Sequence, residues 1–236
     1  MEKILAIATN AAPLLHGKPT GLWLSELTHF LDVIEGSGFG YDLASPLGGK
    51  IPIDERRKSL EAQVRSDPVN ARYMNSAGFL EKLGASLRAA DVDPRDYAAL
   101  YLSGGHGTMF DFRQSAPLQR LIGELYSEGR YLSGVCHGVS GFIDSTDSAG
   151  RRIVAGKTVT GFSNFEDALD GSKKLMPFLL EDELKRSGAT YRKNLIPFTE
   201  RVEVDGRLVT GQNPQSAHGV GKALVAALAA RTAGAV

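Results

Sequence analysis

The sequence predicts an α/β fold in three layers, in which helices cover both faces of a mostly parallel sheet. Strand-like and helix-like segments alternate through the first 145 residues, as they do in parallel sheets joined by helices. Two apolar strand segments also end in glycine-rich turns, at residues 103–107 and 134–138, and helix-like sequence follows each turn. In such folds these turns meet at the carboxyl edge of the sheet, where ligands bind.

The individual elements follow from apolar periodicity and from turn residues. Expected strands cover residues 3–9, 41–45, 97–103, 131–135, 152–154 with 157–160, 201–204 and 208–210. Expected helices cover residues 22–35, 77–88, 116–128, 139–143, 173–187 and 214–231, the last continuing into an alanine-rich end that frays at 232–236. Asp205 and Gly206 mark a two-residue hairpin. The polar region 48–76 is interpreted as an insertion with short helices, so that residues 1–236 form a single domain.

The only cysteine of the chain, Cys136, lies in the turn Gly134-Val135-Cys136-His137-Gly138. A strand, a sharp turn and a helix start in succession are typical of a nucleophile elbow, which raises a side chain above the edge of the sheet. A helix N-terminus favours an anion, so we expect a thiol of lowered pKa at Cys136. The alternative is a buried cysteine that packs as a small hydrophobe.

The second glycine-rich turn is Ser103-Gly104-Gly105-His106-Gly107. Glycines at this edge allow backbone N–H groups to approach a substrate oxygen. The alternative is a tight turn without a binding role. The spacing differs from the G-x-G-x-x-G pattern of dinucleotide sites, and we expect no cofactor.

Taken together, these motifs resemble the DJ-1/PfpI superfamily, and more narrowly its Hsp31-like branch of glutathione-independent glyoxalases. The two signature segments are residues 103–112 and 135–138, and residues 21–27, 48–54, 159–162 and 208–214 agree in the same order. The resemblance therefore covers nearly the whole chain. It implies a flavodoxin-like sandwich, related to class I glutamine amidotransferase domains, and a homodimer.

The resemblance also implies a Cys-His-acid site made by Cys136, His137 and a carboxylate that orients the imidazole. The family's acid falls at Asp167, and the neighbouring Glu166 is the alternative. Glu26 would point at the sulfur and exchange a proton with it or with substrate. Its alternative is one polar position of an amphipathic helix.

Substrate oxygen would be held by the backbone N–H groups of Gly105 and His137, in the loop that also carries Gly104. His106 either contacts substrate or only bonds the loop. The implied reaction converts methylglyoxal, a small reactive carbonyl compound, and water to lactate in a small pocket. No C-x-x-C or H-E-x-x-H spacing occurs, so a metal site has no support in the sequence.

Composition limits the partners. The chain of 236 residues carries 27 basic and 27 acidic residues, so its formal net charge is zero and neither nucleic acid nor an anionic membrane is favoured. The apolar N-terminal run is too short for a signal peptide, and one cysteine fits a reducing compartment. We therefore expect a soluble cytoplasmic protein.

Two other functions stay open at this point, because a fold and a triad do not define a substrate. The first is a stress-linked holding chaperone or a protein-repair (deglycase) factor. The second is a hydrolase or hydratase that uses the same residues on another small substrate. A large exposed apolar patch would favour the chaperone, and an enclosed pocket would favour an enzyme.

Overall fold

A seven-stranded sheet forms the centre of the computed structural model, which describes residues 2–233. Its strands run in the order β10-β11-β7-β6-β1-β4-β5. All neighbours are parallel except the edge pair β10 and β11. The strands are β1 (Lys3–Ile7), β4 (Gly40–Ser45), β5 (Leu87–Arg88), β6 (Tyr97–Leu102), β7 (Tyr131–Val135), β10 (Val202–Asp205) and β11 (Leu208–Gly211).

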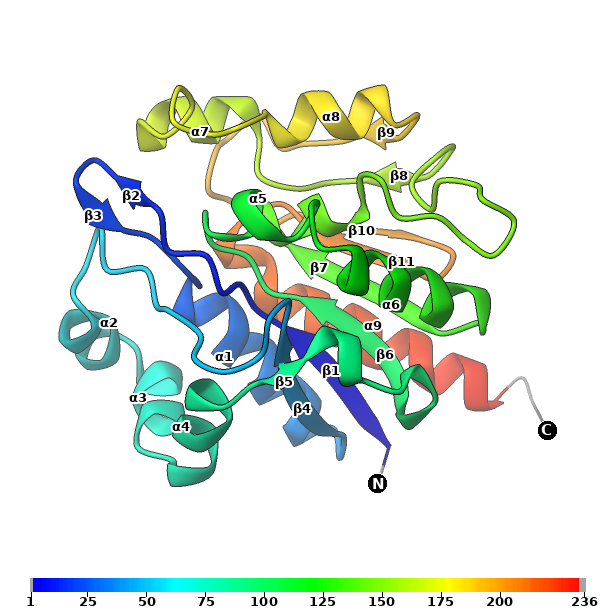
Figure 1. Cartoon of the computed structure of the whole chain (residues 1–236), viewed down its shortest axis with the longest axis horizontal. Coiled ribbons are helices and arrows are strands. Elements are labelled where there is room, and N and C mark those ends of the chain that lie inside the picture. Colours follow the sequence, from blue (N-terminus) through cyan, green and yellow to red (C-terminus); the bar gives the residue numbers. More distant parts are fainter. Residues whose placement is uncertain (1, 234–236) are drawn as a thin grey trace.

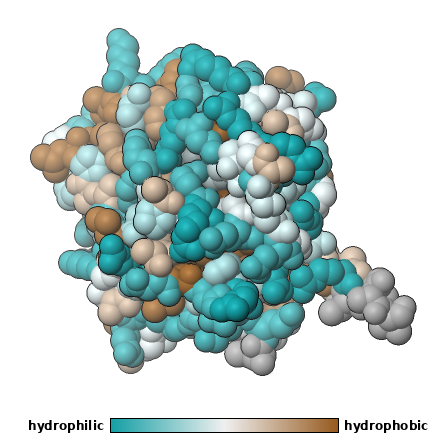
Figure 2. Space-filling model, turned by 45° about the vertical axis from the view of Figure 1, so that its right-hand side comes forward, coloured by the Kyte–Doolittle hydropathy of each residue, from teal (hydrophilic) through white to brown (hydrophobic). Residues whose placement is uncertain are grey.

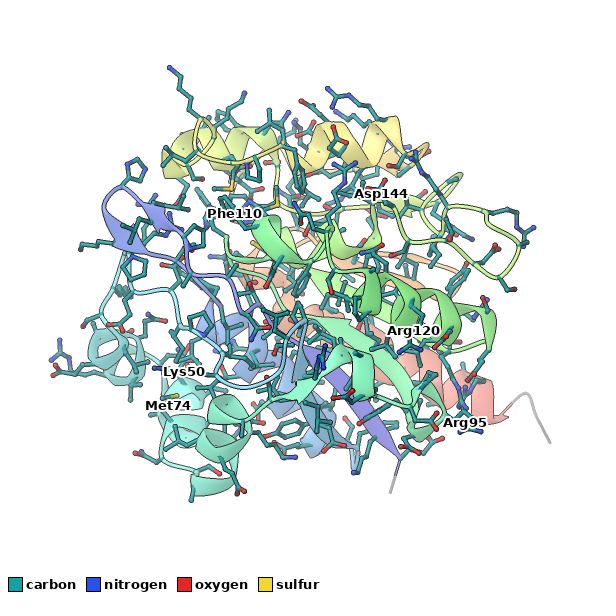
Figure 3. The ribbon with its side chains drawn as sticks, viewed as in Figure 1. Lys50, Met74, Arg95, Phe110, Arg120 and Asp144 are labelled. Atoms are coloured by element: carbon teal, nitrogen blue, oxygen red, sulfur yellow. The ribbon has the colours of Figure 1, made fainter. Side chains whose placement is uncertain are left out.

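Helices cover both faces of this sheet, as the sequence predicted (Figure 1). One face packs against α1 (Leu24–Gly36) and α9 (Ala217–Ala233), and the other against α6 (Ala116–Ser127). Central strands β1 and β6 are apolar and almost completely buried, which parallel strands between two helix layers require. Side chains fill the space between the layers (Figure 3).

Shorter elements lie around the sheet. They are the hairpin β2 (Leu14–Leu15) and β3 (Lys18–Pro19), the pair β8 (Thr158–Val159) and β9 (Thr190–Tyr191), and the helices α2 (Leu60–Ser66), α3 (Pro68–Met74), α4 (Ala77–Gly84), α5 (Thr108–Asp111), α7 (Asn164–Asp170) and α8 (Leu180–Arg186). Helices α7 and α8 form the upper rim in Figure 1. The predicted short helices of the 48–76 region are α2 and α3.

Several predicted elements are shorter or different. The helix predicted at 173–187 is only α8, because Pro177 prevents the preceding residues from being helical. Of the strand predicted at 152–154, only Arg152 is paired, in an isolated antiparallel bridge with Thr146. Residues 153–156 form a turn that ends at Gly156, which has a positive φ. The helix predicted at 77–88 ends at Gly84, and β5 follows it.

The end of the chain and the elbow also differ in detail. The helix predicted at 214–231 starts with a 3₁₀ turn, Pro214–Ser216, before α9. The elbow helix predicted at 139–143 is a 3₁₀ helix, Cys136–Phe142. The predicted hairpin is present, but its two-residue turn is Gly206 and Arg207, one residue later than the predicted Asp205 and Gly206. Asp205 is the last residue of β10 and pairs with Leu208, and Gly206 has a φ of 62°. The predicted fraying at 232–236 concerns an end of which residues 234–236 lie outside the described part of the chain.

Helix α7, which carries Asp167, was not among the predicted helices, although a local signal was present. The side chain of Ser163 accepts a hydrogen bond from the Glu166 N–H, and the Glu166 carboxylate accepts one from the Ser163 N–H. This capping box, Ser-x-x-Glu, satisfies two free N–H groups of the first turn. Gly171 ends the helix in the left-handed conformation, with φ 77°.

Strand β6 and helix α1 are tied together beneath the site. The ring of Tyr101 stacks on that of Phe30 with centroids 3.5 Å apart, and its hydroxyl donates to the backbone oxygen of Glu26 at 2.6 Å. All three side chains are buried. This packing therefore holds α1, and with it Glu26, in place against β6.

We predict that Tyr101→Phe lowers the free energy of unfolding by about 1 kcal/mol, because the ring stack remains and one buried hydrogen bond is lost. Urea denaturation followed by circular dichroism measures this change. An unchanged midpoint and slope would show that the hydroxyl contributes nothing to the junction between β6 and α1.

Candidate active site

The turn between β7 and the 3₁₀ helix is the predicted nucleophile elbow. Cys136 has a φ of 55°, which a residue with a side chain adopts at a cost of about 1–2 kcal/mol. Gly138 makes the turn possible, since a Cβ there would lie 2.5 Å from the backbone oxygen of Leu102. The strained turn places the sulfur at the carboxyl edge of the sheet, beside the end of β6.

The imidazole of His137 joins the sulfur to a carboxylate. Its Nδ1 lies 3.6 Å from Cys136 Sγ, and its Nε2 lies 3.1 Å from Asp167 Oδ1. His137 and Asp167 are completely buried, and Cys136 is almost so. The predicted contact between Asp167 and the ring of His137 is therefore present.

Glu166, the alternative acid, has a different environment. Its two carboxylate oxygens accept hydrogen bonds from Ser163 N and Oγ, Gln212 Nε2, Asn213 Nδ2 and Phe198 N, at 2.7–3.0 Å. This carboxylate caps α7 and joins it to the loops around β11. Its hydrogen bonds link neighbouring segments, and none of them goes to His137.

Glu26 lies on α1 and is completely buried, as the resemblance implied. Neither carboxylate oxygen makes a hydrogen bond of regular geometry. Burial raises the pKa of Glu26 from 4.5 to about 8, while the Cys136 thiol and the Gly104 N–H, which face the carboxyl, oppose this shift less strongly. Glu26 is therefore mainly protonated at neutral pH.

The expected low pKa of Cys136 is wrong. Burial and the neighbouring Glu26 raise the pKa of the thiol well above its usual range, and only the His137 N–H opposes them. The short 3₁₀ helix and its N–H groups do not outweigh the loss of water around the sulfur. The free cysteine is thus a thiol that needs a base to become a nucleophile, and His137 Nδ1 is in place to act as one.

The loop 103–107 comes close enough to the sulfur that no side chain fits at Gly104. A Cβ there would lie 2.4 Å from Glu26 Oε2, 2.7 Å from the Val135 oxygen and 3.0 Å from Cys136 Cβ. Gly105 has a φ of 107° and lines the cavity above the sulfur. Both glycines lie where the sequence analysis expected a substrate oxygen to bind.

His106 is buried, and both its ring nitrogens have partners. Arg56 Nη2 lies 2.5 Å from Nδ1, and Ser172 Oγ lies 2.9 Å from Nε2. Burial, followed by the neighbouring His137 and two arginines, lowers the pKa of His106 well below its usual range, so the ring is neutral. The ring of His106 lines the cavity, while both of its nitrogens are hydrogen-bonded to other residues of the protein, Arg56 and Ser172.

The donor atoms of His106, His137 and Asp167 lie within 4.8 Å of one another, a grouping that could hold a metal ion. The hydrogen bonds argue against this use. Arg56 can only donate, so Nδ1 of neutral His106 accepts and Nε2 carries the proton. A metal ion on Nε2 would move that proton to Nδ1, directly against the guanidinium.

The site opens into a cavity of about 460 Å³. This cavity is larger than a three-carbon substrate needs, which corrects the expectation of a small pocket. Its wall includes Trp23, Ser25, His29, Arg57, Phe162, Leu169, Asp170, Phe198, Pro214 and Gln215. Trp23, Ser25, Phe162 and Pro214 lie in the segments that carry the family resemblance, whereas the others lie outside these segments and no motif of the sequence analysis pointed to them.

We predict that Gly104→Ala lowers the free energy of unfolding by about 1–3 kcal/mol, the usual cost of overpacking a rigid core. The added methyl would meet two backbone or buried groups that cannot move aside. Gly78→Ala is the matched control, because a Cβ at this helical glycine meets nothing within 4 Å. Equal stability of the two variants in denaturant would contradict the close packing at Gly104.

We also predict that the stability of the protein falls as pH rises from about 4.5 to about 8, through Glu26. In this range the unfolded chain releases the Glu26 proton while the folded chain keeps it, so raising the pH favours unfolding. Glu26→Gln removes this contribution. The variant should gain stability relative to wild type across this range, by on the order of a few kcal/mol, in unfolding titrations at several pH values. A difference between the two proteins that is independent of pH would contradict the raised pKa.

Comparisons with known proteins find relatives that match nearly the whole chain. Glutathione-independent glyoxalase HSP31 of Saccharomyces cerevisiae is 31% identical over 224 residues, which cover 92% of this chain and 94% of the relative. Glyoxalase 3 of Candida albicans is 31% identical over 239 residues, covering 96% and 98%.

Solved structures give the same picture. The crystal structure of glyoxalase III from Candida albicans superposes with a TM-score of 0.83 at 30% identity, covering 96% of this chain and 97% of that one. Rapid Encystment Protein 24 KDa from Francisella tularensis superposes with a TM-score of 0.89 at 34% identity, covering 97% and 99%. The family model described as DJ-1/PfpI family matches residues 25–227, and the chain belongs to this family.

Proposed function

We propose that this chain is a glutathione-independent glyoxalase that converts methylglyoxal and water to lactate. The observation that carries the proposal is a protonated carboxyl, Glu26, beside a thiol whose other neighbour is an oriented imidazole. The relatives that share nearly the whole chain bear this activity in their names. The reaction is an internal redox change, in which the aldehyde carbon is oxidised and the ketone carbon reduced, so it needs no external oxidant.

The first step is addition of the sulfur to the aldehyde carbon. His137 Nδ1 takes the thiol proton as the S–C bond forms, and Asp167 stabilises the resulting imidazolium. The carbonyl electron pair moves onto oxygen, where the backbone N–H groups of Gly105 and His137 hold the charge and Glu26 donates its proton. The product is a hemithioacetal, and Glu26 is now ionised.

The second step moves hydrogen between the two carbons. Ionised Glu26 removes the proton from the former aldehyde carbon, and the His137 imidazolium protonates the ketone oxygen to give an enediol. Glu26 then returns its proton to the neighbouring carbon, while His137 takes the hydroxyl proton from the carbon that carries sulfur. A carbonyl forms at that carbon, which gives a lactoyl thioester and leaves Glu26 ionised and His137 protonated. A carboxyl with a pKa of about 8 suits both directions of transfer near neutral pH.

The third step is hydrolysis. Ionised Glu26 takes a proton from the attacking water, and the C–S bond breaks as the His137 imidazolium gives its proton to the departing sulfur. This restores the thiol, the protonated Glu26 and the neutral His137, and it releases lactic acid, which ionises to lactate. The balance is one methylglyoxal and one water consumed for each lactate formed.

We predict that the purified protein forms lactate from methylglyoxal without glutathione and that Cys136→Ala abolishes turnover. Glu26→Gln keeps the shape of the side chain but removes its ionisable proton, so kcat should fall by about 10²–10⁴. An enzyme-coupled lactate assay measures both variants. Turnover of Glu26→Gln within a few fold of wild type would remove Glu26 from the mechanism.

A holding chaperone is the second candidate, because large apolar side chains are exposed near the cavity. Leu195 and Ile196 are 97% and 68% exposed, and they lie in the same loop as Phe198, which lines the cavity. Figure 2 shows one face on which hydrophobic residues gather mainly at the upper left among hydrophilic ones. Suppression of client aggregation by Cys136→Ala, in the absence of lactate formation by wild type, would favour this role.

The location and assembly of the protein stay predictions. Among the described residues, the helices are too short or too polar to cross a bilayer. We propose a cytoplasmic homodimer, as the family resemblance implies, and light scattering during size-exclusion chromatography tests the dimer.

A further inference from the structure

Behind His137, on the side away from the sulfur, lies a continuous line of polar side chains: Arg56, His106, Ser172 and Asp167. We propose that Arg56, His106 and Ser172 are positioning residues, which orient Asp167 and hold His137 in the tautomer that can accept the thiol proton. The inference rests on the proposed function, in which His137 is the base for Cys136. It assigns roles to three residues that do not touch the reacting sulfur.

The direction of the hydrogen bonds is set at Arg56. Its guanidinium can only donate, and Nη2 lies 2.5 Å from His106 Nδ1. Arg56 is itself held by Asp54, which accepts from its Nε at 2.8 and 3.1 Å and from its backbone N–H at 2.9 Å. Its side chain is 6% exposed, and that of Asp54 is completely buried. His106 therefore accepts at Nδ1.

The proton of neutral His106 must then be on Nε2. Ser172 Oγ, at 2.9 Å, is nearer to this nitrogen than Asp170 Oδ2 at 3.5 Å or Asp167 Oδ1 at 3.8 Å. Nε2–H donates to the serine oxygen, which leaves the single hydroxyl proton of Ser172 for another acceptor. That acceptor is Asp167 Oδ1, at 3.1 Å.

Asp167 in turn determines which ring nitrogen of His137 carries the proton. Its Oδ1 accepts from Ser172 and from His137 Nε2, both at 3.1 Å, while Oδ2 is buried without a hydrogen-bond partner. The proton of His137 is thus on Nε2, and the lone pair of Nδ1 faces Cys136 Sγ. The other tautomer would place an unprotonated nitrogen against a buried carboxylate and leave no acceptor for the thiol proton.

Ser172 is the residue of this line whose substitution tests the inference most directly, because it supplies one of the two hydrogen bonds to Asp167 Oδ1. Oδ1 of Asp167 has two donors, and removal of the serine hydroxyl leaves only His137 to orient the carboxylate. Ser172 follows Gly171, the left-handed end of α7, which brings its side chain back toward Asp167 on the same helix. An Asp167 carboxylate held by one hydrogen bond would be less well aligned with His137, and catalysis is sensitive to such misalignment.

The experiment compares Ser172→Ala with Ser172→Thr, which restores a hydroxyl. Ser145→Ala is the matched control, since Ser145 is another buried serine outside the site, and its hydroxyl has two acceptors within reach, Gln119 Oε1 and the Gly141 oxygen. We expect kcat of Ser172→Ala to fall by about 10–100-fold with KM changed by no more than about threefold, because alignment and not substrate binding is lost. Ser172→Thr should recover most of the loss, and Ser145→Ala should match wild type.

The second readout is independent of turnover. Long-range proton–nitrogen NMR of histidine rings reports which ring nitrogen carries the proton. Wild type should show His137 and His106 protonated at Nε2, and Ser172→Ala should shift His137 toward a mixture of tautomers. An absence of glyoxalase activity in wild type would overturn the proposed function, while these spectra would still test the positioning line.

Two results would overturn the inference. One is a Ser172→Ala protein with wild-type kcat and unchanged His137 nitrogen shifts. The other is a fall in kcat accompanied by unchanged His137 shifts, or one that Ser172→Thr does not recover, since either would mean that Ser172 acts only through the local fold.

Discussion

The site depends on one unfavourable arrangement, the burial of the Glu26 carboxyl against the Cys136 thiol without a regular hydrogen-bond partner. A carboxylate in such surroundings is costly, so the group keeps its proton and its pKa rises to about 8. The surrounding fold maintains this arrangement. Tyr101 holds the Glu26 backbone from below, and the missing side chain at Gly104 leaves room for the carboxyl from above.

The same burial explains why the cysteine requires help. A thiol at the start of an exposed helix would ionise more easily, but here the lost water and the neighbouring Glu26 favour the neutral form. Ionisation is therefore coupled to proton acceptance by His137.

Glu166 and Asp167 show how environment separates two neighbouring acids. Glu166 is held by groups from several segments and caps the first turn of α7, so it has a structural role. Asp167, one residue later, faces the other way and meets His137 and Ser172 through one oxygen. The different partners of the two carboxylates follow from their positions in the first turn of α7, not from a difference in their chemistry.

Local sequence was enough to predict the parallel sheet, the elbow at Cys136 and the glycine loop, because apolar strands and glycine turns depend on near neighbours. Through the family resemblance it also placed Glu26 beside the sulfur and Asp167, with Glu166 as the alternative, beside His137. It could not predict the line from Arg56 to Asp167, or the cavity wall, since Arg56, His106 and Ser172 come from three loops that meet only in the folded chain.

The pKa values of Glu26 and Cys136 were decided by the tertiary structure alone. The identity of the residues, the strained turn and the order of the elements follow from the sequence itself. The degree of burial depends on how α1, β6 and β7 pack, and that packing removes the water that would otherwise stabilise either charge. A motif can therefore indicate which atoms react, whereas the protonation state of those atoms before the reaction depends on how the folded core buries them.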